Sequence, residues 1–197
     1  MSRLKLLLAL AVIAGAGWPA TGVTPHARVV PPAVALRASA GPGDNAQTKV
    51  ACDLSAYVTD PDPKGTNLRS GPNRSAPVVK TLPNANDTVV KITGYSGGWF
   101  EISRAETVGD EEKVVFQGRG WVHSSLLGLD VGNNGFGPPA LYAAPSKQSR
   151  VLKRLKPDED AVKLLACKDD WVKVQSGGLT GWLSSEGQCA NPLTTCP

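Results

Sequence analysis

Apolar and polar residues alternate in short runs along the chain, and clusters of glycine, proline, asparagine and serine separate these runs. Within residues 99–102 the alternation places Phe100 and Ile102 on one face of a strand and Trp99 on the other. Phe100 and Ile102 are therefore predicted to lie in the core, and Trp99 on an outer or groove face. In the first half of the chain, strands are predicted at residues 78–82, 88–93, 99–103 and 120–122.

The second half of the chain repeats the pattern of the first half. By the same parity, Val172 and Val174 are predicted to be buried and Trp171 to lie outside, although core packing stays open for Trp99 and Trp171. Trp121 and Trp182 precede the final turn of each half and are predicted to fill the core. The corresponding segments and residues are 67–72 and 140–145, Trp99 and Trp171, and Trp121 and Trp182.

Composition supports an all-β fold class, because glycine and proline are abundant and aromatic residues are few. Between Ile102 and Gly120 the first repeat is longer than the second. Residues 103–119 are therefore predicted to form an extended hairpin, either a solvated decoration or a contact arm. Its tip is acidic and contains Asp110, Glu111 and Glu112.

The amino terminus has the residue order of a signal peptide, with Arg3 and Lys5 before an apolar run. The run over residues 6–14 is shorter than the roughly 20 residues that span a bilayer. Export to the periplasm or the medium is therefore predicted, without membrane insertion of the mature form. The predicted segments are a signal peptide at 1–27, a flexible lead-in at 28–51, a first domain at 52–131, a linker at 132–139 and a second domain with a cysteine-containing tail at 140–197.

Four cysteines are present: Cys52, Cys167, Cys189 and Cys196. In an oxidising compartment an even number predicts two disulfides, with three possible connectivities, and buried free thiols are the alternative. A short loop closed by Cys189 and Cys196 is one solution. Zinc is disfavoured because no cysteine pair has ligand spacing and His123 is the only histidine beyond the leader. No metal or cofactor is expected.

Charge and motifs argue against nucleic-acid binding and against catalysis. Acidic and basic residues are interspersed, and the formal net charge is only +4, so no basic footprint for nucleic acid is visible. His123 has the chemistry of a general base, but no nucleophile elbow precedes a serine, and a Cys-His site needs a reduced cysteine in an exported protein. A protein that is not an enzyme is expected.

Residues 67–72 read Asn-Leu-Arg-Ser-Gly-Pro, and a Gly-Gly-Trp turn ending at Trp99 and Gly-Trp-Val-His-Ser at residues 120–124 follow. This series resembles the bacterial SH3 (SH3b) domain family. The second repeat is more divergent, and its start at residues 140–142 and its Asp170-Trp171 pair are similar to eukaryotic SH3 domains. The resemblance implies two tandem small SH3-like β-barrels, which cover most of the chain after Cys52.

Bacterial SH3 domains are similar to modules that bind peptidoglycan peptides or position a cell-wall hydrolase. The resemblance therefore implies an exported binding protein that recognises cell-wall peptidoglycan or its peptides. The alternative is a protein-interaction or inhibitor subunit of an exported partner, such as a cell-wall hydrolase. Tryptophans beside turns are typical of binding hot spots. The candidate binding residues are Trp99, His123, Tyr142, Asp170 and Trp171.

Overall fold

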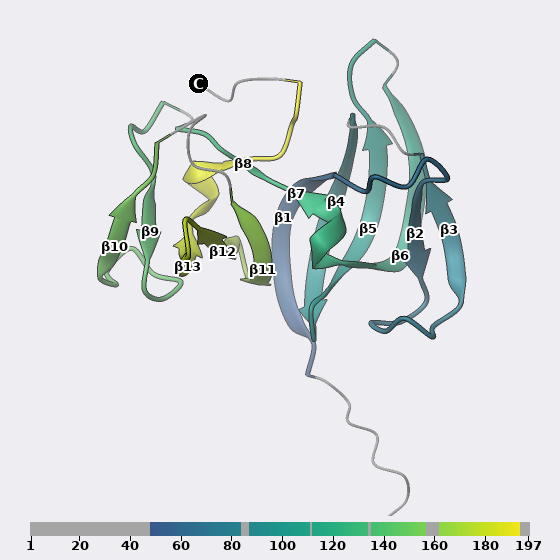
Figure 1. Ribbon diagram of the computed structural model, residues 1–197, viewed down its shortest axis with the longest axis horizontal. Helices are drawn as coiled ribbons and strands as arrows, with labels where there is room; N and C mark the ends of the chain where they lie inside the picture. The colour runs from purple at the N-terminus through teal and green to yellow at the C-terminus, as the bar shows by residue number, and fades with distance from the viewer. Residues whose placement is uncertain (1–47, 84–86, 111, 134, 157–161, 194–197) are drawn as a thin grey trace, which may run out of the picture. The chain divides into compact units, whose positions relative to one another are not determined.

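The computed structural model describes residues 48–83, 87–110, 112–133, 135–156 and 162–193 (Figure 1). In these ranges the protein is all-β, as predicted, and contains two short 3-10 helices but no α-helix. None of the described residues forms a helix with the length and apolar character needed to cross a membrane. The predicted signal peptide, Glu111 and Cys196 lie outside the described residues.

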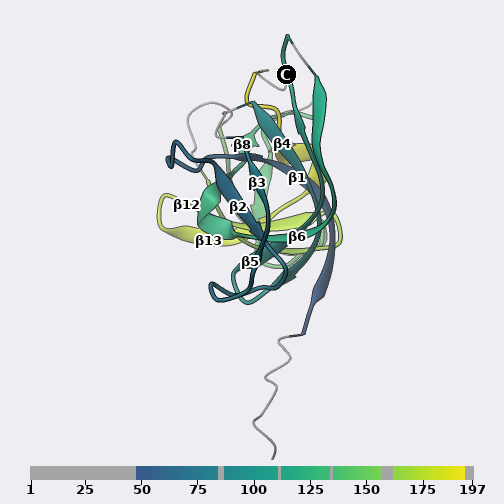
Figure 2. The same cartoon turned by 90° about the vertical axis from the view of Figure 1, so that its right-hand side faces the viewer.

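The first half folds into an antiparallel seven-stranded sheet with the order β3-β2-β6-β5-β4-β1-β7. Figure 2 shows that this sheet is strongly curled. A short 3-10 helix, η1 (Ser124–Leu126), connects the last two strands. The strands are β1 (Val50–Val58), β2 (Thr66–Arg69), β3 (Val78–Leu82), β4 (Thr88–Ser96), β5 (Trp99–Thr107), β6 (Lys113–His123) and β7 (Leu127–Gly128).

Strand β1 was not predicted from the sequence. It begins at Val50, before the expected start of the first domain at Cys52, and pairs with β4 and β7. Its side chains alternate between buried and more exposed positions. The sequence contains this period-two signal, but two of its buried members, Cys52 and Ala56, are small and do not stand out as a hydrophobic run. The buried members are Cys52, Leu54, Ala56 and Val58.

The second half forms an antiparallel five-stranded sheet with the order β10-β9-β13-β12-β11. A further two-stranded sheet pairs β8 (Asp130–Val131) with β14 (Gln188–Cys189), and the 3-10 helix η2 (Ser185–Gly187) precedes β14. The strands of the larger sheet are β9 (Ala140–Tyr142), β10 (Val151–Arg154), β11 (Lys163–Lys168), β12 (Trp171–Ser176) and β13 (Leu179–Leu183).

The core contains the residues that strand parity predicted. Phe100 and Ile102 are fully buried in the first half, and Val172 and Val174 are fully buried in the second half. The rings of Phe100 and Tyr95 also contact each other, with their centroids 5.4 Å apart. The alternation of apolar and polar residues therefore identified the buried face of β5 and of β12.

The prediction that Trp182 fills the core is wrong. Trp182 is only partly buried, and the Lys173 ammonium lies 6.0 Å from its ring centroid. Leu183 occupies the core position instead, and adjacent residues of a strand point to opposite faces. Trp121 is buried, but it pairs with Glu101 while its neighbour Val122 pairs with Phe100, so it lies on the face opposite the core cluster.

A disulfide between Cys52 and Cys167 joins β1 to β11 across 115 positions of sequence. Backbone hydrogen bonds flank it: the Asp53 amide donates to the Asp169 carbonyl at 2.6 Å, and the Asp169 amide donates to the Ala51 carbonyl at 2.9 Å. Cys189 is disulfide-bonded as well. No cysteine in the described part of the chain is a free thiol.

Strands β5 and β6 form a long hairpin. Their pairing runs from Trp99 opposite His123 to Thr107 opposite Lys113, and Asp110 is exposed in the connection between the strands. The residues that make the first repeat longer than the second therefore extend two existing strands.

Candidate functional site

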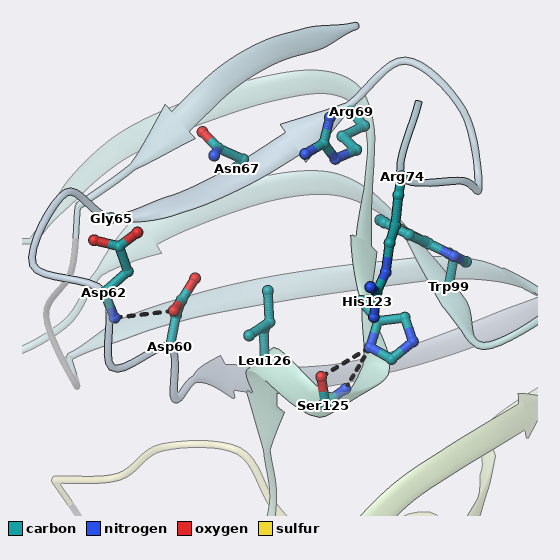
Figure 3. Close-up of a pocket in the computed structure, with 10 residues that line it drawn as sticks. All are labelled: Asp60, Asp62, Gly65, Asn67, Arg69, Arg74, Trp99, His123, Ser125 and Leu126. Carbon is teal, nitrogen blue, oxygen red and sulfur yellow. Dashed lines mark hydrogen bonds between the residues drawn. The ribbon is translucent and has the colours of Figure 1, made fainter. Parts of the chain in front are cut away.

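A cleft of about 280 Å³ lies on the first half of the protein (Figure 3). The loop before β2, strand β2, the loop between β2 and β3, the start of β5 and the helix η1 all contribute residues to its lining. Segments that are far apart in sequence therefore meet at one surface. Two of the predicted binding residues, Trp99 and His123, are among the lining residues.

Trp99 is positioned by the tight turn that precedes it. Gly97 and Gly98 have positive φ angles of 55° and 89°, which glycine adopts without steric cost and which a two-residue hairpin turn requires. Trp99 and His123 pair directly across β5 and β6, and their rings meet edge to face with centroids 5.3 Å apart. Trp99 lies on the face opposite Phe100, but only 8% of its surface is exposed, so it forms a wall of the cleft and not an open platform.

His123 has a structural role at one of its ring nitrogens. Nδ1 accepts a hydrogen bond from the Ser125 amide at 3.3 Å and lies 2.8 Å from Ser125 Oγ, so the ring caps η1. Because a backbone amide donates to Nδ1, the neutral ring carries its proton on Nε2. The Nε2–H group is then the donor that the ring offers to a ligand.

The other three predicted binding residues lie in the second half. The rings of Tyr142 and Trp171 meet edge to face with centroids 5.4 Å apart, and Ser185 Oγ donates to the Asp170 carboxylate at 2.8 Å. Tyr142 lines a smaller cavity of about 160 Å³ together with Arg154. The structure therefore separates the five predicted residues into one pair in the first half and one trio in the second.

The charged residues of the cleft beside Trp99 and His123 were not predicted from the sequence. Asp60 and Asp62 lie on the loop before β2, Arg69 ends β2, and Arg74 lies on the loop between β2 and β3. Loop residues show no periodicity, so pattern reasoning gives them no place in the fold. The repeated Asp-Pro at residues 60–63 is a turn signal that could have located these two carboxylates on a loop.

A second group of charges lies on the same sheet, around the buried carboxylate of Glu101. Only 5% of this side chain is exposed; it forms ion pairs with Lys49 and Arg119 and accepts a hydrogen bond from Thr93. Burial raises the pKa of Glu101, but the hydrogen bonds and positive charges around it outweigh that effect and hold the pKa below its ordinary value. Lys49, from the predicted lead-in, is therefore part of the folded structure.

Replacing Glu101 with glutamine is expected to remove a component of stability that depends on pH. Because the folded pKa lies below the ordinary value of 4.5, this component is fully present above that pH and is lost as the pH falls through the folded pKa. Thermal unfolding of the parent and Glu101→Gln, measured from about pH 3 to pH 7, should show the two midpoints converging at low pH.

Glu106→Gln is the matched control, because Glu106 lies on the same strand and pairs with Arg104 at 2.7 Å, but its side chain is 41% exposed. An exposed ion pair contributes about 0–1 kcal/mol, so this variant should follow the parent at every pH. If the thermal midpoints of the parent and Glu101→Gln differed by the same amount at every pH, the lowered pKa of Glu101 would be contradicted.

No metal centre is apparent in the described ranges, where no three histidine, cysteine, aspartate or glutamate side chains form a group that could hold an ion. The cleft instead offers aromatic edges, a histidine donor, carboxylates and guanidinium groups. Such a surface suits a small polar ligand.

A family model described as the bacterial SH3 domain matches residues 64–128 and 138–187, more than half of the chain. The chain belongs to the bacterial SH3 domain family. The two matched segments confirm the predicted pair of tandem repeats. Strand β1 and the loop with Asp60 and Asp62 precede the first bacterial SH3 segment, whereas Trp99 and His123 lie inside it.

Among solved structures, the chain is similar to NlpC2 from Trichomonas vaginalis, with 14% identity, a TM-score of 0.28, and coverage of 73% of this chain and 48% of that chain. For NlpC1 from Trichomonas vaginalis the identity is 16%, the TM-score 0.28, and the coverage 74% of this chain and 47% of that chain. The chain thus spans about half the length of each structure. No curated protein matches the chain.

Proposed function

We propose that this protein is an exported, non-catalytic binding protein whose bacterial SH3 repeats recognise cell-wall peptidoglycan or its peptides. The observation that carries the proposal is the cleft beside the Trp99–His123 pair. Both residues of this pair lie within the segment that matches the bacterial SH3 domain. The cleft's mixture of aromatic edges and charged groups suits a peptide better than an apolar ligand.

The proposal includes the arrangement and location of the mature protein. Each repeat forms a small SH3-like barrel, the leader over residues 1–27 is removed, and the protein acts in the periplasm or outside the cell. The Cys52–Cys167 disulfide supports this location, because structural disulfides persist in oxidising compartments and are rare in the cytosol.

A binding role also accounts for the one arrangement in the cleft that resembles a catalytic pair. Ser125 Oγ lies 2.8 Å from His123 Nδ1, a distance suited to a nucleophile and its base. However, the Ser125 amide also donates to Nδ1, and in the described part of the chain no carboxylate hydrogen-bonds to Nε2 to orient the ring as a base. The pair therefore serves as a helix cap in this proposal.

The long hairpin supports a second candidate function, the binding of an exported protein partner. Val114 on β6 is 43% exposed, and the neighbouring Asp110 and Glu112 are exposed as well. An apolar side chain bordered by charges is a common composition for a contact surface. In this alternative the hairpin, and not the cleft, carries the binding energy.

Retention on purified cell-wall sacculi distinguishes the two functions. His123→Asn keeps a capping side chain but removes the ring that meets Trp99, so we expect a thermal midpoint within a few degrees of the parent and about tenfold weaker retention. Val114→Thr, on the hairpin, should be retained like the parent.

Loss of retention in Val114→Thr, with none in His123→Asn, would transfer the function to the hairpin. A parent protein that sacculi do not retain would overturn the cell-wall proposal itself.

A further inference from the structure

The cleft of the first repeat carries negative charge at one end and positive charge at the other. In Figure 3, Asp60 and Asp62 lie together on the loop before β2, whereas Arg69 and Arg74 lie at the opposite end, with Leu126 between the two pairs. All five residues line the same cleft. A ligand that fills it therefore meets carboxylates at one end and guanidinium groups at the other.

The opposite charges are held apart by the local structure. Asp60 accepts hydrogen bonds from the Asp62 amide at 3.0 Å and from Thr66 Oγ1 at 3.1 Å, and these bonds fix the acidic loop. Arg69 Nη1 donates to the Ala76 carbonyl at 2.9 Å, which holds that guanidinium at the other end. In the described ranges, none of the cleft's two aspartates and two arginines forms an ion pair with another residue. The four charges therefore remain available to a ligand.

The acidic end of the cleft lies outside the segment that matches the family. Asp60 and Asp62 precede residue 64, where the match to the bacterial SH3 domain begins. They follow β1, and the Thr59 amide donates to the Leu126 carbonyl at 2.9 Å, which fastens the start of the loop to η1 beside the cleft. The additional strand thus places two carboxylates at a cleft whose other charged residues belong to the repeat.

The size of the cleft limits how much of a ligand it holds. Its volume of about 280 Å³ is just below the roughly 300–1,000 Å³ found for small-molecule sites. It therefore suits one or two amino acid residues and not a long peptide. Separated charges of opposite sign favour a ligand with the complementary pair and disfavour ligands with a single charge.

We propose that the cleft binds the end of a short peptide that carries a free carboxylate and a free ammonium group within one or two residues. The carboxylate binds Arg69 and Arg74, and the ammonium binds Asp60 and Asp62. This inference rests on the proposed function, because it identifies the ligand as a cell-wall stem peptide with an unmodified diamino acid and a free terminal carboxylate.

Four synthetic stem peptides test the proposal by isothermal titration calorimetry: the free peptide, the peptide acetylated on its side-chain amine, the peptide amidated at its terminal carboxyl, and the peptide with both modifications. Each single modification should weaken binding to the parent protein about tenfold, a typical size for the loss of one charged contact. Equal binding of all four peptides overturns the proposal.

Variants at the two ends make the test specific. Asp62→Asn keeps a side-chain oxygen that accepts from the Lys64 amide, as Asp62 does at 2.9 Å, but removes the charge. Acetylation of the peptide should no longer weaken its binding to this variant, whereas amidation should still weaken it. For Arg74→Gln, amidation should have no effect and acetylation should still weaken binding. Lys64→Gln is the matched control, because Lys64 is in the same loop but does not line the cleft, and it should respond like the parent.

The outcomes separate this inference from the proposed function. If sacculi retain the parent but acetylation weakens Asp62→Asn as much as the parent, only the charge assignment is overturned. The same conclusion follows if no free peptide binds and sacculi retain Asp62→Asn and Arg74→Gln like the parent. If sacculi do not retain the parent, the proposed function fails and this inference fails with it.

Discussion

Replacing Phe100 with alanine is expected to unfold the first half of the protein or to prevent it from accumulating. The Phe100 side chain is fully buried, and its ring packs against Tyr95. Truncating a buried phenylalanine costs about 3–5 kcal/mol, a large part of the roughly 5–15 kcal/mol that stabilises a small domain. Urea denaturation followed by circular dichroism would measure the loss.

Phe100→Leu is the matched variant, because leucine keeps most of the apolar volume and should lose much less stability than alanine. An alanine variant that unfolds at the same urea concentration as the parent would contradict the assignment of Phe100 to the core. Trp99→Ala cannot serve as a surface control, because Trp99 is only 8% exposed and its loss removes packing as well as ligand contact. For this reason His123→Asn is the better probe of binding.

Removing the Cys52–Cys167 disulfide by the double substitution Cys52→Ala and Cys167→Ala is expected to be the other strongly destabilising change. The bond closes a loop across 115 positions, and the loss of such a long constraint costs about 2–5 kcal/mol because the unfolded chain gains conformational freedom. Alanine is preferred to serine because both positions are buried and a hydroxyl there would lack a partner. The thermal midpoint of the double variant should fall by several degrees.

Measurements with and without reductant distinguish the contribution of this bond to stability from that of the disulfide that contains Cys189. In the parent, reduction removes both bonds, whereas in the double variant only the second bond remains to be broken. Adding reductant should therefore lower the thermal midpoint more in the parent than in the double variant. Equal drops, or a double variant with the midpoint of the parent, would mean that the Cys52–Cys167 bond contributes little to stability.

The parts of the fold that depend on neighbouring residues were predictable from the sequence. The bounds of β3 agree with the predicted strand at residues 78–82, and β4 and β5 start at the predicted residues 88 and 99. The glycine pair at 97 and 98 forms the predicted turn, and Phe100 and Ile102 are buried as predicted. These features follow from strand periodicity and turn conformation, which are local properties of the chain.

The pairing of distant segments was decided only by the tertiary structure. Trp182 was predicted to fill the core because it precedes the final turn, but packing in the fold gives the core position to Leu183. Four cysteines left three connectivities open, and the contact of β1 with β11 selects Cys52 with Cys167. The cleft depends on long-range contacts as well. Its acidic loop and its arginines lie on different segments, and their spacing in the sequence does not reveal how far apart they lie in the folded protein. Local preferences therefore determined where strands begin and turn, and packing between segments determined which side chains meet.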